Sequence, residues 1–173
     1  MDDVFLGIGS NMGDRIYFLA QAVRKMRELP STHIVKVSSM YETEPVGVKN
    51  QGDFLNAVVW AQTSVGVADF HSRIKLIEKE IGRLKRIRWG PREIDIDILL
   101  YGNIVMNEAT LTIPHAELIN RKFVLQPLAE IASETVHPAV HKTVRALLAE
   151  CKDTNSVERS AQLTRSFFTT LQE

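Results

Sequence analysis

The stretch that decides the fold runs over residues 88–99 and reads RWGPREIDIDIL. From Ile94 to Ile98, isoleucine and aspartate alternate, and this period of two is typical of a β-strand. Side chains two positions apart point to the same face of a strand. Asp95 and Asp97 should therefore project from one face, with their Cα atoms roughly 7 Å apart.

Two interpretations of this acidic pair remain open from the strand alone. In a central strand, two buried like charges would cost several kcal/mol unless something compensates them, and a divalent cation does so. Carboxylate oxygens suit Mg²⁺, and a pair at this spacing can bridge two ions about 4 Å apart. The other interpretation is an amphipathic edge strand whose acids face water.

The segment before the strand is strongly basic. It contains the cations Arg83, Lys85, Arg86, Arg88 and Arg92 in a chain whose lysines and arginines equal its acids at 21 each. Such a segment is ordinarily a solvated loop or a nucleic-acid patch. Because it leads directly into the two aspartates, the combination favours polyphosphate binding, with metals on one side and guanidinium groups on the other.

Outward from this strand, hydrophobic periodicity predicts an alternation of strands and helices. The predicted strands cover residues 4–9, 34–41, 54–63 and 93–101, with a short one near 104–106. The predicted helices run from the N-cap Asp14 to about Leu29, and over 67–83, 124–131 and 143–151. Since 54–63 is apolar on both faces, we expect it to be central. The order over the first hundred residues predicts an α+β fold, a ferredoxin-like split βαβ sandwich with helices packed on one side of a mostly antiparallel sheet.

The chain length predicts one domain, which we place at residues 1–152, followed by a C-terminal extension at 153–173. In the extension, Val157, Ala161, Phe168 and Leu171 have loosely helical spacing. We expect this segment to pack on the core, and a self-association surface is the alternative.

Composition excludes several functional classes. The net charge of zero argues against nucleic-acid and membrane partners, and no segment reaches the roughly 18 apolar residues of a membrane span. The single cysteine, Cys151, fits a reducing compartment, so we expect a cytoplasmic protein. The glycines from Gly7 to Gly13 nearly match a dinucleotide fingerprint, but the third comes one residue late, and the chain has no P-loop motif.

At this point the sequence resembles the 6-hydroxymethyl-7,8-dihydropterin pyrophosphokinase family, whose signature residues 88–99 fit throughout. The resemblance covers most of the chain to about residue 150, with further matches at Gly9-Ser10-Asn11, Ser38-Ser39, Tyr41-Glu42-Thr43, Phe54-Leu55-Asn56-Ala57, Gly82-Arg83, Thr112 to His115, Asn120-Arg121 and Pro127-Leu128. It implies transfer of a diphosphate from ATP to the hydroxymethyl group of the reduced pterin in folate biosynthesis. AMP would leave, and no protein nucleophile would be required.

The resemblance also implies roles for individual residues. Asp95 and Asp97 would hold two Mg²⁺ ions, and with Arg83 and Arg92 they would form the catalytic set. The ATP site would comprise Glu78, Arg83, Lys85, Arg92, Ile98, Thr112, His115 and Arg121. The pterin site would comprise Thr43, Val46, Phe54, Asn56, Trp89 and Phe123. Taken without the family, Glu78 reads as a helix-surface acid, His115 as a capping or core histidine, and Phe54 as a core aromatic.

The chain departs from the family pattern at several positions. Phe54 stands where tyrosine is common, Thr110 where a basic residue is common, Ala116 where an aromatic is common, and Lys85 where arginine is common. These departures bear on nucleotide and loop contacts and leave the metal-binding acids in place. We expect small-molecule substrates and a monomer. The alternative functions are a nucleotidyltransferase that transfers AMP, and a binding module of the ferredoxin-like or nucleic-acid-binding type.

Overall fold

The structure is a computed structural model that describes residues 1–45, 50–84 and 90–172. A six-stranded antiparallel sheet forms its centre, with the strand order β5-β1-β4-β3-β8 and with β2 also paired to β4. The strands are β1 (Asp2–Ser10), β2 (Thr32–Val37), β3 (Tyr41–Thr43), β4 (Phe54–Thr63), β5 (Asp95–Tyr101) and β8 (Val157–Arg159). A separate ribbon pairs β6 (Met106–Asn107) with β7 (Thr112–Ile113).

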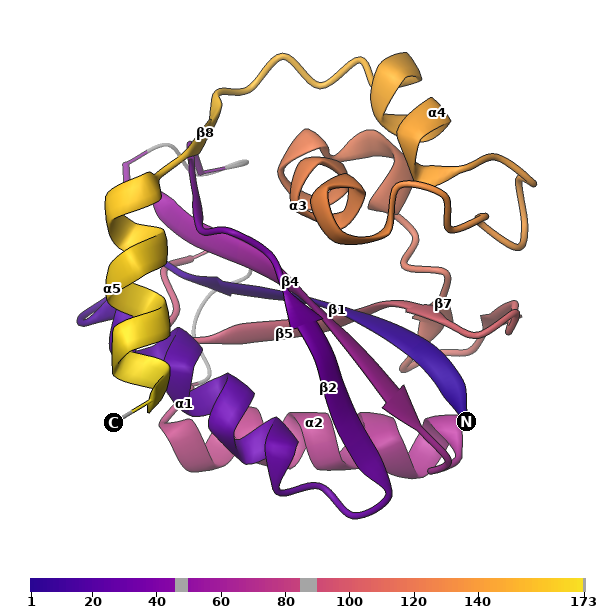
Figure 1. Ribbon diagram of the computed structural model, residues 1–173, viewed down its shortest axis with the longest axis horizontal. Helices are drawn as coiled ribbons and strands as arrows, with labels where there is room; N and C mark the ends of the chain where they lie inside the picture. The colour runs from indigo at the N-terminus through magenta and orange to yellow at the C-terminus, as the bar shows by residue number, and fades with distance from the viewer. Residues whose placement is uncertain (46–49, 85–89, 173) are drawn as a thin grey trace.

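Helices cover both faces of the sheet (Figure 1). They are α1 (Arg15–Arg27), α2 (Val67–Ile81), α3 (Lys122–Ala132), α4 (Val144–Glu150) and α5 (Ala161–Gln172), with a short 3₁₀ turn at Leu118–Asn120. In Figure 1, α1 and α2 lie below the sheet and α3 and α4 above it, while α5 lies beside α1. The α+β sandwich predicted from the sequence is confirmed, with α1 and α2 on one side as expected, and α3 and α4 fill the other side.

Strand alternation separates the interior into two apolar cores. Val4, Leu6 and Ile8 of β1 face α1 and α2, whereas Phe5 faces α3 and α4. The isoleucines of β5 belong to the first core, as their period of two predicts. The sheet is thus apolar on both faces, and any polar site on it requires a local interruption of one core.

Local signals in the sequence set the helix ends. Asp14 caps α1 by accepting a hydrogen bond from the backbone N–H of Tyr17 at 3.0 Å. Gly82 ends α2 in the left-handed conformation, with φ of 107°, which glycine adopts without steric cost. Thr143 caps α4 through the N–H of Ala146.

The structure corrects one prediction about the strands, decides one alternative that was left open, and confirms one prediction. The predicted strand at 34–41 is two strands, because the chain leaves β2 after Val37 and enters β3 at Tyr41. The strand that carries the acids, β5, pairs only with β1 among the described strands and so lies at an edge of the sheet. The third strand, β4, is central as predicted, since it pairs with β1, β2 and β3.

A shift of register in β5 was not visible in the sequence. Phe5 pairs with Leu100 and Leu6 with Ile98, so Leu99 is an extra residue in the ladder. Its carbonyl accepts a hydrogen bond from the backbone N–H of His115 at 2.9 Å. The bulge therefore ties the segment after β7 to the strand that bears the two aspartates.

The C-terminal extension packs on the rest of the chain. Its strand β8 pairs with β3, and Phe167 and Leu171 of α5 enter the first core. Phe168, which the sequence pattern placed on the packed face, is instead 38% exposed. Leu171 thus packs as predicted, whereas Phe167 takes the buried place that the prediction gave to Phe168.

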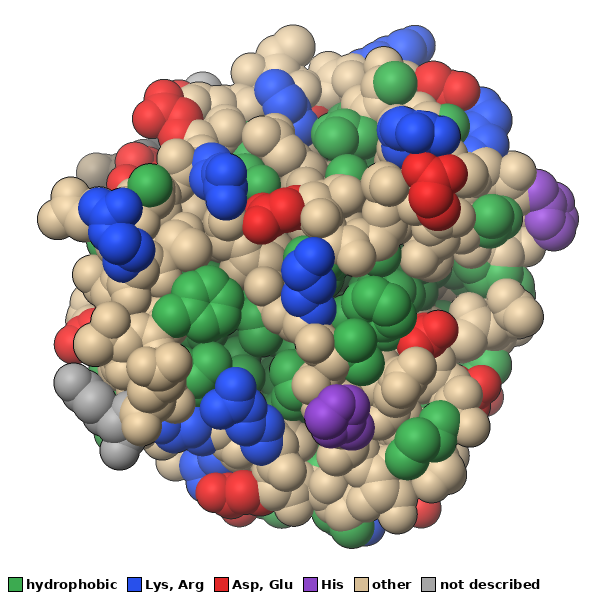
Figure 2. Space-filling model, in the orientation of Figure 1, with side chains coloured by type: hydrophobic (Ala, Val, Ile, Leu, Met, Phe, Trp, Pro, Cys, Tyr) green, Lys and Arg blue, Asp and Glu red, His purple; other side chains and the backbone are tan. Residues whose placement is uncertain are grey.

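The surface shows no concentration of one charge on the face drawn in Figure 2, where basic and acidic side chains are interspersed. Among the described residues, no helix combines the length and the apolar character needed to span a bilayer.

Candidate active site

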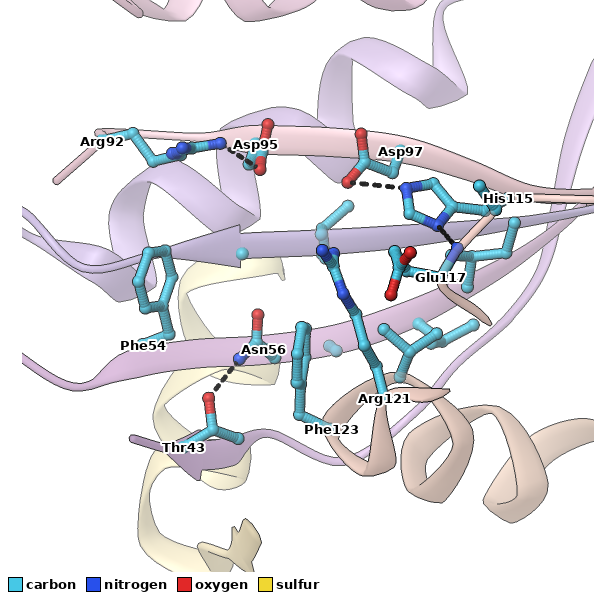
Figure 3. Close-up of a pocket in the computed structure, with 18 of the residues that line it drawn as sticks. Thr43, Phe54, Asn56, Arg92, Asp95, Asp97, His115, Glu117, Arg121 and Phe123 are labelled. Atoms are coloured by element: carbon cyan, nitrogen blue, oxygen red, sulfur yellow. Dashed lines mark hydrogen bonds and ion pairs between the residues drawn. The ribbon is translucent and has the colours of Figure 1, made fainter. Parts of the chain in front are cut away.

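A cavity of about 790 Å³ opens on the sheet face that α3 covers. Its floor is formed by β1, β4 and β5, and its far wall by the residues around the start of α3 (Figure 3). Of the residues predicted for the site, the cavity wall includes Thr43, Phe54, Asn56, Arg83, Arg92, Asp95, Asp97, His115, Arg121 and Phe123. The fold thus gathers residues that are far apart in the sequence, from Thr43 to Phe123, around one space.

One half of the cavity is built on the acids of β5. Asp95 and Asp97 both point into the cavity, with side chains that are 24% and 38% exposed. Arg83 forms an ion pair with one carboxylate oxygen of Asp95 at 2.9 Å, and Arg92 donates a hydrogen bond to the other at 2.6 Å. The acids are therefore neither dispersed in bulk water, as an ordinary edge strand would place them, nor buried without charge partners.

Glu78 holds this half in place from below. It is 3% exposed, and one carboxylate oxygen accepts from Arg83 and from the backbone N–H of Ile96, the latter at 2.7 Å. Burial raises the pKa of Glu78, while Lys75 and Arg83 act in the opposite direction. Glu78 does not line the cavity; it orients Arg83 and β5.

Asp97 faces His115 across the cavity, with 3.9 Å between its carboxylate and Nε2 of the histidine. Burial and the nearby charge of Asp95 raise the pKa of Asp97, and burial lowers the pKa of His115. The Nδ1 atom of His115 accepts from the backbone N–H of Glu117 at 3.2 Å. In the neutral ring the proton is then on Nε2, directed toward Asp97.

The other half of the cavity is aromatic and amide-lined. The rings of Phe54 and Phe123 lie on either side of Asn56 in Figure 3. The amide nitrogen of Asn56 donates to Oγ1 of Thr43 at 2.6 Å, which fixes the orientation of the amide. Asn56 is 8% exposed, and its side-chain carbonyl oxygen is a hydrogen-bond acceptor among mainly apolar neighbours.

Gly9 lies between the two halves. It pairs with Asp95 of β5 on one side and with Asn56 of β4 on the other. Since adjacent strands are 4.7–4.9 Å apart, about 10 Å separates the backbone of the acid from that of the amide. A Cβ at position 9 would come 2.5 Å from Oδ1 of Asn56, so only glycine leaves room for that side chain.

The donor set fits magnesium held in part by a substrate. Magnesium in such sites takes one or two carboxylates, with phosphate and water oxygens as the other ligands, and Asp95 and Asp97 provide that number. Among residues 1–45, 50–84 and 90–172, no group of three or more His, Cys, Asp or Glu side chains could enclose a metal. A closed, all-protein metal site is therefore not what these residues form.

Several predicted site residues lie elsewhere. Ile98 is 4% exposed and belongs to the first core, and Thr112 lies on β7, where it donates to Asn107 at 3.0 Å. Neither lines the cavity. Val46, Lys85 and Trp89 lie outside the described residues.

Lys75 and Glu117 are charged residues of the cavity wall that were not predicted. Lys75 donates to the carbonyl of Ile96 at 2.9 Å and pairs with Glu78 at 3.2 Å, one helical turn along α2. Its spacing from Glu78 was the available signal, but that pair also fits an ordinary exposed helix face. Glu117 follows His115 in a segment without periodicity, so nothing in the sequence marked it.

Comparisons with known proteins identify the family to which this chain is similar. A family model described as 7,8-dihydro-6-hydroxymethylpterin-pyrophosphokinase matches residues 5–133. The 2-amino-4-hydroxy-6-hydroxymethyldihydropteridine pyrophosphokinase of Aquifex aeolicus is 44% identical over 150 residues, which cover 87% of this chain and 92% of that protein. The Haemophilus influenzae protein of the same name is 40% identical, over 80% of this chain and 86% of its own length.

Solved structures share the fold. The crystal structure of wild-type Plasmodium falciparum HPPK-DHPS matches with a TM-score of 0.68 and 16% identity over 86% of this chain. The match spans 44% of that longer chain, so the likeness concerns one part of it.

Proposed function

The chain belongs to the 7,8-dihydro-6-hydroxymethylpterin-pyrophosphokinase family, and we propose that the cavity between β5 and α3 is where it transfers diphosphate from ATP to the hydroxymethyl dihydropterin. The family assignment makes the protein an ATP-dependent pyrophosphokinase of folate biosynthesis. The division of the cavity into an acidic half and an aromatic half supports the assignment of one substrate to each.

In this proposal the triphosphate of ATP occupies the acidic half. Asp95 and Asp97 hold magnesium there, and when bound the metal neutralises phosphate charge. Arg83, Arg92 and Arg121 bind phosphate oxygens, a task for which the planar guanidinium is suited. Both oxygens of Asp95 are already engaged by arginines, so the protein keeps these cations beside its acids before any substrate enters.

The reduced pterin occupies the aromatic half. Its flat bicyclic ring stacks between Phe54 and Phe123, and Asn56 presents its oxygen to the ring's amino edge. Thr43 holds that amide in one orientation through the 2.6 Å hydrogen bond. Arg121 lies over the ring of Phe123 at 5.7 Å and joins the two halves at the start of α3.

The reaction requires alignment more than chemistry from the protein. The pterin hydroxyl oxygen forms a bond to the β-phosphorus and its proton passes to solvent, while the bond from the β-phosphorus to the α–β bridging oxygen breaks and AMP leaves with that electron pair. The observation that carries the proposal is the position of Gly9, which places the acid and the amide two strand spacings apart on one face of the sheet. That is a separation at which two bound substrates can meet.

The experiment that tests this proposal measures nucleotide products. Incubating the protein with ATP, Mg²⁺ and 6-hydroxymethyl-7,8-dihydropterin should yield AMP, with no AMP when the pterin or the metal is omitted. Release of pyrophosphate instead would indicate the alternative nucleotidyltransferase. Salt-sensitive binding of RNA or DNA, with no AMP formed, would indicate a nucleic-acid-binding module.

The matched variants for this assay are Asp95→Ala and Asp97→Ala. Each should lower turnover at least about a hundredfold, because each removes a carboxylate that we assign to the metal. The fold should persist, since both side chains are partly exposed and contribute no apolar packing. Turnover within a few fold of the unmodified protein in both variants would contradict the assignment.

A further inference from the structure

The C-terminal extension meets the sheet beside the aromatic half of the cavity. Strand β8 pairs with β3, which in turn pairs with β4, so Val157 lies in one row with Thr43 and Phe54. Without β8, the three residues of β3 would form an edge strand held only by β4. The segment that carries Thr43 therefore depends on the extension for its second backbone partner.

Met40, the residue just before β3, makes both of its backbone hydrogen bonds to the extension. Its N–H donates to Oγ1 of Thr164 at 2.9 Å, and its carbonyl accepts from the N–H of Ser160 at 3.0 Å. Met40 is fully buried, so its polar backbone groups have no access to solvent in place of these partners. Thr164 also donates to the carbonyl of Ser160 at 2.6 Å, which fixes its hydroxyl in the accepting orientation.

A second contact joins the extension to α3. Arg159 donates through Nε to Oγ of Ser39 at 2.8 Å, and that hydroxyl donates to Glu130 of α3, also at 2.8 Å. Glu130 further accepts from the hydroxyl of Tyr41 at 2.8 Å. The start of this same helix carries Phe123, so one hydrogen-bonded group links both walls of the aromatic half.

The residues involved form a continuous row across the sheet. Arg159 pairs with Tyr41, Tyr41 with Asn56, and Asn56 with Gly9. The extension joins this row at the end opposite to β5, where the acids lie. Loss of its contacts should thus act first on the amide and aromatic side chains and only remotely on the phosphate-binding half.

We infer that residues 156–172 of the extension are a positioning element for the pterin half of the active site, acting through Thr164 and Arg159 on the segment from Ser38 to Thr43. This inference rests on the proposed function, because it assigns the pterin to the cavity between Phe54 and Phe123. Thr164 and Arg159 are positioning residues: their side chains bond to Met40 and Ser39, directly before the strand that holds Thr43, and neither lines the cavity.

The test compares the binding of the two substrates in variants of the full chain. Thr164→Val keeps the side-chain volume and removes the acceptor for Met40. We expect the dissociation constant for 6-hydroxymethyl-7,8-dihydropterin, measured with Mg²⁺ and a nonhydrolysable ATP analogue present, to rise about tenfold. The dissociation constant for the ATP analogue alone should stay within about twofold. Thr164→Ser keeps the hydroxyl and should restore pterin binding.

Arg159→Gln is the second variant, in case Thr164→Val folds poorly. The Arg159 side chain is 64% exposed, so its replacement should not affect folding, and a rise of about threefold in the same constant is expected. Val4→Ala is the control for general destabilisation. Val4 is fully buried in β1 and pairs with Tyr101 and Ala61, five residues along the strand from Gly9.

The control should lower the melting temperature and leave both dissociation constants unchanged. Equal weakening of pterin and ATP binding in Thr164→Val would overturn the inference, as would pterin binding unchanged in both Thr164→Val and Arg159→Gln. These outcomes differ from failure of the proposed function, in which the unmodified protein itself would bind no pterin and form no AMP, and the inference would fall with it.

Discussion

Gly9 is the residue at which the two halves of the cavity meet. It has the acid-bearing strand on one side and Asn56 on the other, and the space above it is filled by the amide oxygen of Asn56. Glycine is therefore needed at position 9 because the Asn56 side chain comes close to its Cα, and not because the backbone adopts an unusual conformation.

We predict that Gly9→Ala selectively weakens pterin binding. The added methyl group would come 2.5 Å from Oδ1 of Asn56, which is held by Thr43, so the amide must leave its present orientation. The dissociation constant for the pterin should rise about tenfold, and the free energy of unfolding should fall by about 1–3 kcal/mol. Calorimetric titration and urea unfolding measure the two effects.

The matched control is Gly66→Ala. A Cβ at position 66 meets no heavy atom within 4 Å, and this glycine lies at the start of α2 away from the cavity. Its pterin affinity should equal that of the unmodified protein. If Gly9→Ala bound pterin as tightly as Gly66→Ala does, Asn56 would not contact the ring as proposed.

For individual residues, the sequence predicted correctly that Asp95 and Asp97 share one face of the strand. It predicted only some of the charged residues that lie near them. Two aspartates in a period of two are sufficient to place both on one face, whatever the rest of the fold does. Lys75 and Glu117 were missed because their approach to the cavity depends on how α2 and the segment after β7 dock, which no local pattern encodes. The burial of Glu78 is a tertiary effect of the same kind, since its helix position alone favours exposure.

Among the elements, the connection between α3 and α4 contains a histidine that is buried in the neutral form. His137 is 5% exposed, and its Nδ1 accepts from the backbone N–H groups of Ala139 at 3.3 Å and Val140 at 3.4 Å. Burial lowers the pKa of His137, because the charged ring is disfavoured there. Protonation of Nδ1 would also break both of these hydrogen bonds, because the protonated nitrogen can no longer accept.

This arrangement predicts a loss of stability in acid. With the folded pKa of His137 below the unfolded value of about 6.5, the unfolded state binds more protons. The contribution of the neutral ring is then complete above about pH 6.5 and is lost as the pH falls through and below that value. Between pH 7.5 and 5, the free energy of unfolding of the unmodified protein should fall more than that of His137→Asn, whose oxygen still accepts at any pH. Urea unfolding at both pH values measures this difference.

His141→Asn provides the control for that comparison. His141 is exposed and has φ of 54°, a conformation that asparagine tolerates, so this substitution should leave the pH dependence as it is in the unmodified protein. Identical pH profiles for His137→Asn and the unmodified protein would show that another group accounts for any loss in acid.

Element by element, the sequence predicted the helices and the central strand more accurately than the edges of the sheet. Long amphipathic stripes and caps such as Asp14 are local signals, and they located α1 and α2 within a few residues. The break between β2 and β3 has no comparable signal, because Ser38 and Ser39 continue an otherwise strand-like run. Their role becomes visible only once Glu130 and the extension are in place.

For the whole molecule, we propose that residues 1–172 form a single folding unit that includes the extension. Phe167 is fully buried in the same core as β1, α1 and α2. Arg24 of α1 also donates to the carbonyl of Thr170, which fastens the end of α5 to the body.

If so, a cavity made in α5 should destabilise the entire chain. Phe167→Ala should lower the free energy of unfolding by about 3–5 kcal/mol, with one cooperative transition throughout. The adjacent Phe168 is 38% exposed, and Phe168→Ala should cost less than about 1 kcal/mol. A separate early transition for α5, with the rest of the chain unchanged, would show that the extension is an independent appendage.

The sequence predicted that the extension packs on the rest of the chain, but not which of its residues make the contact. Its apolar residues indicated a helix that packs on something, yet the packed face could not be fixed, because the spacing of Phe167, Phe168 and Leu171 is compatible with either phenylalanine facing inward. The partner face is supplied by α1, more than a hundred residues earlier in the chain.

The strand β5 has one further consequence for how this protein can vary. Its two sides serve different purposes: the isoleucines pack in the first core, while the aspartates between them line the cavity. Insertion or deletion of one residue before the bulge at Leu99 would exchange the two faces. The carboxylates would then point into the apolar core, and the isoleucines would point into the cavity. The number of residues in this part of β5 is therefore constrained both by the core and by the cavity. Variation here is expected to occur by substitution and not by insertion or deletion.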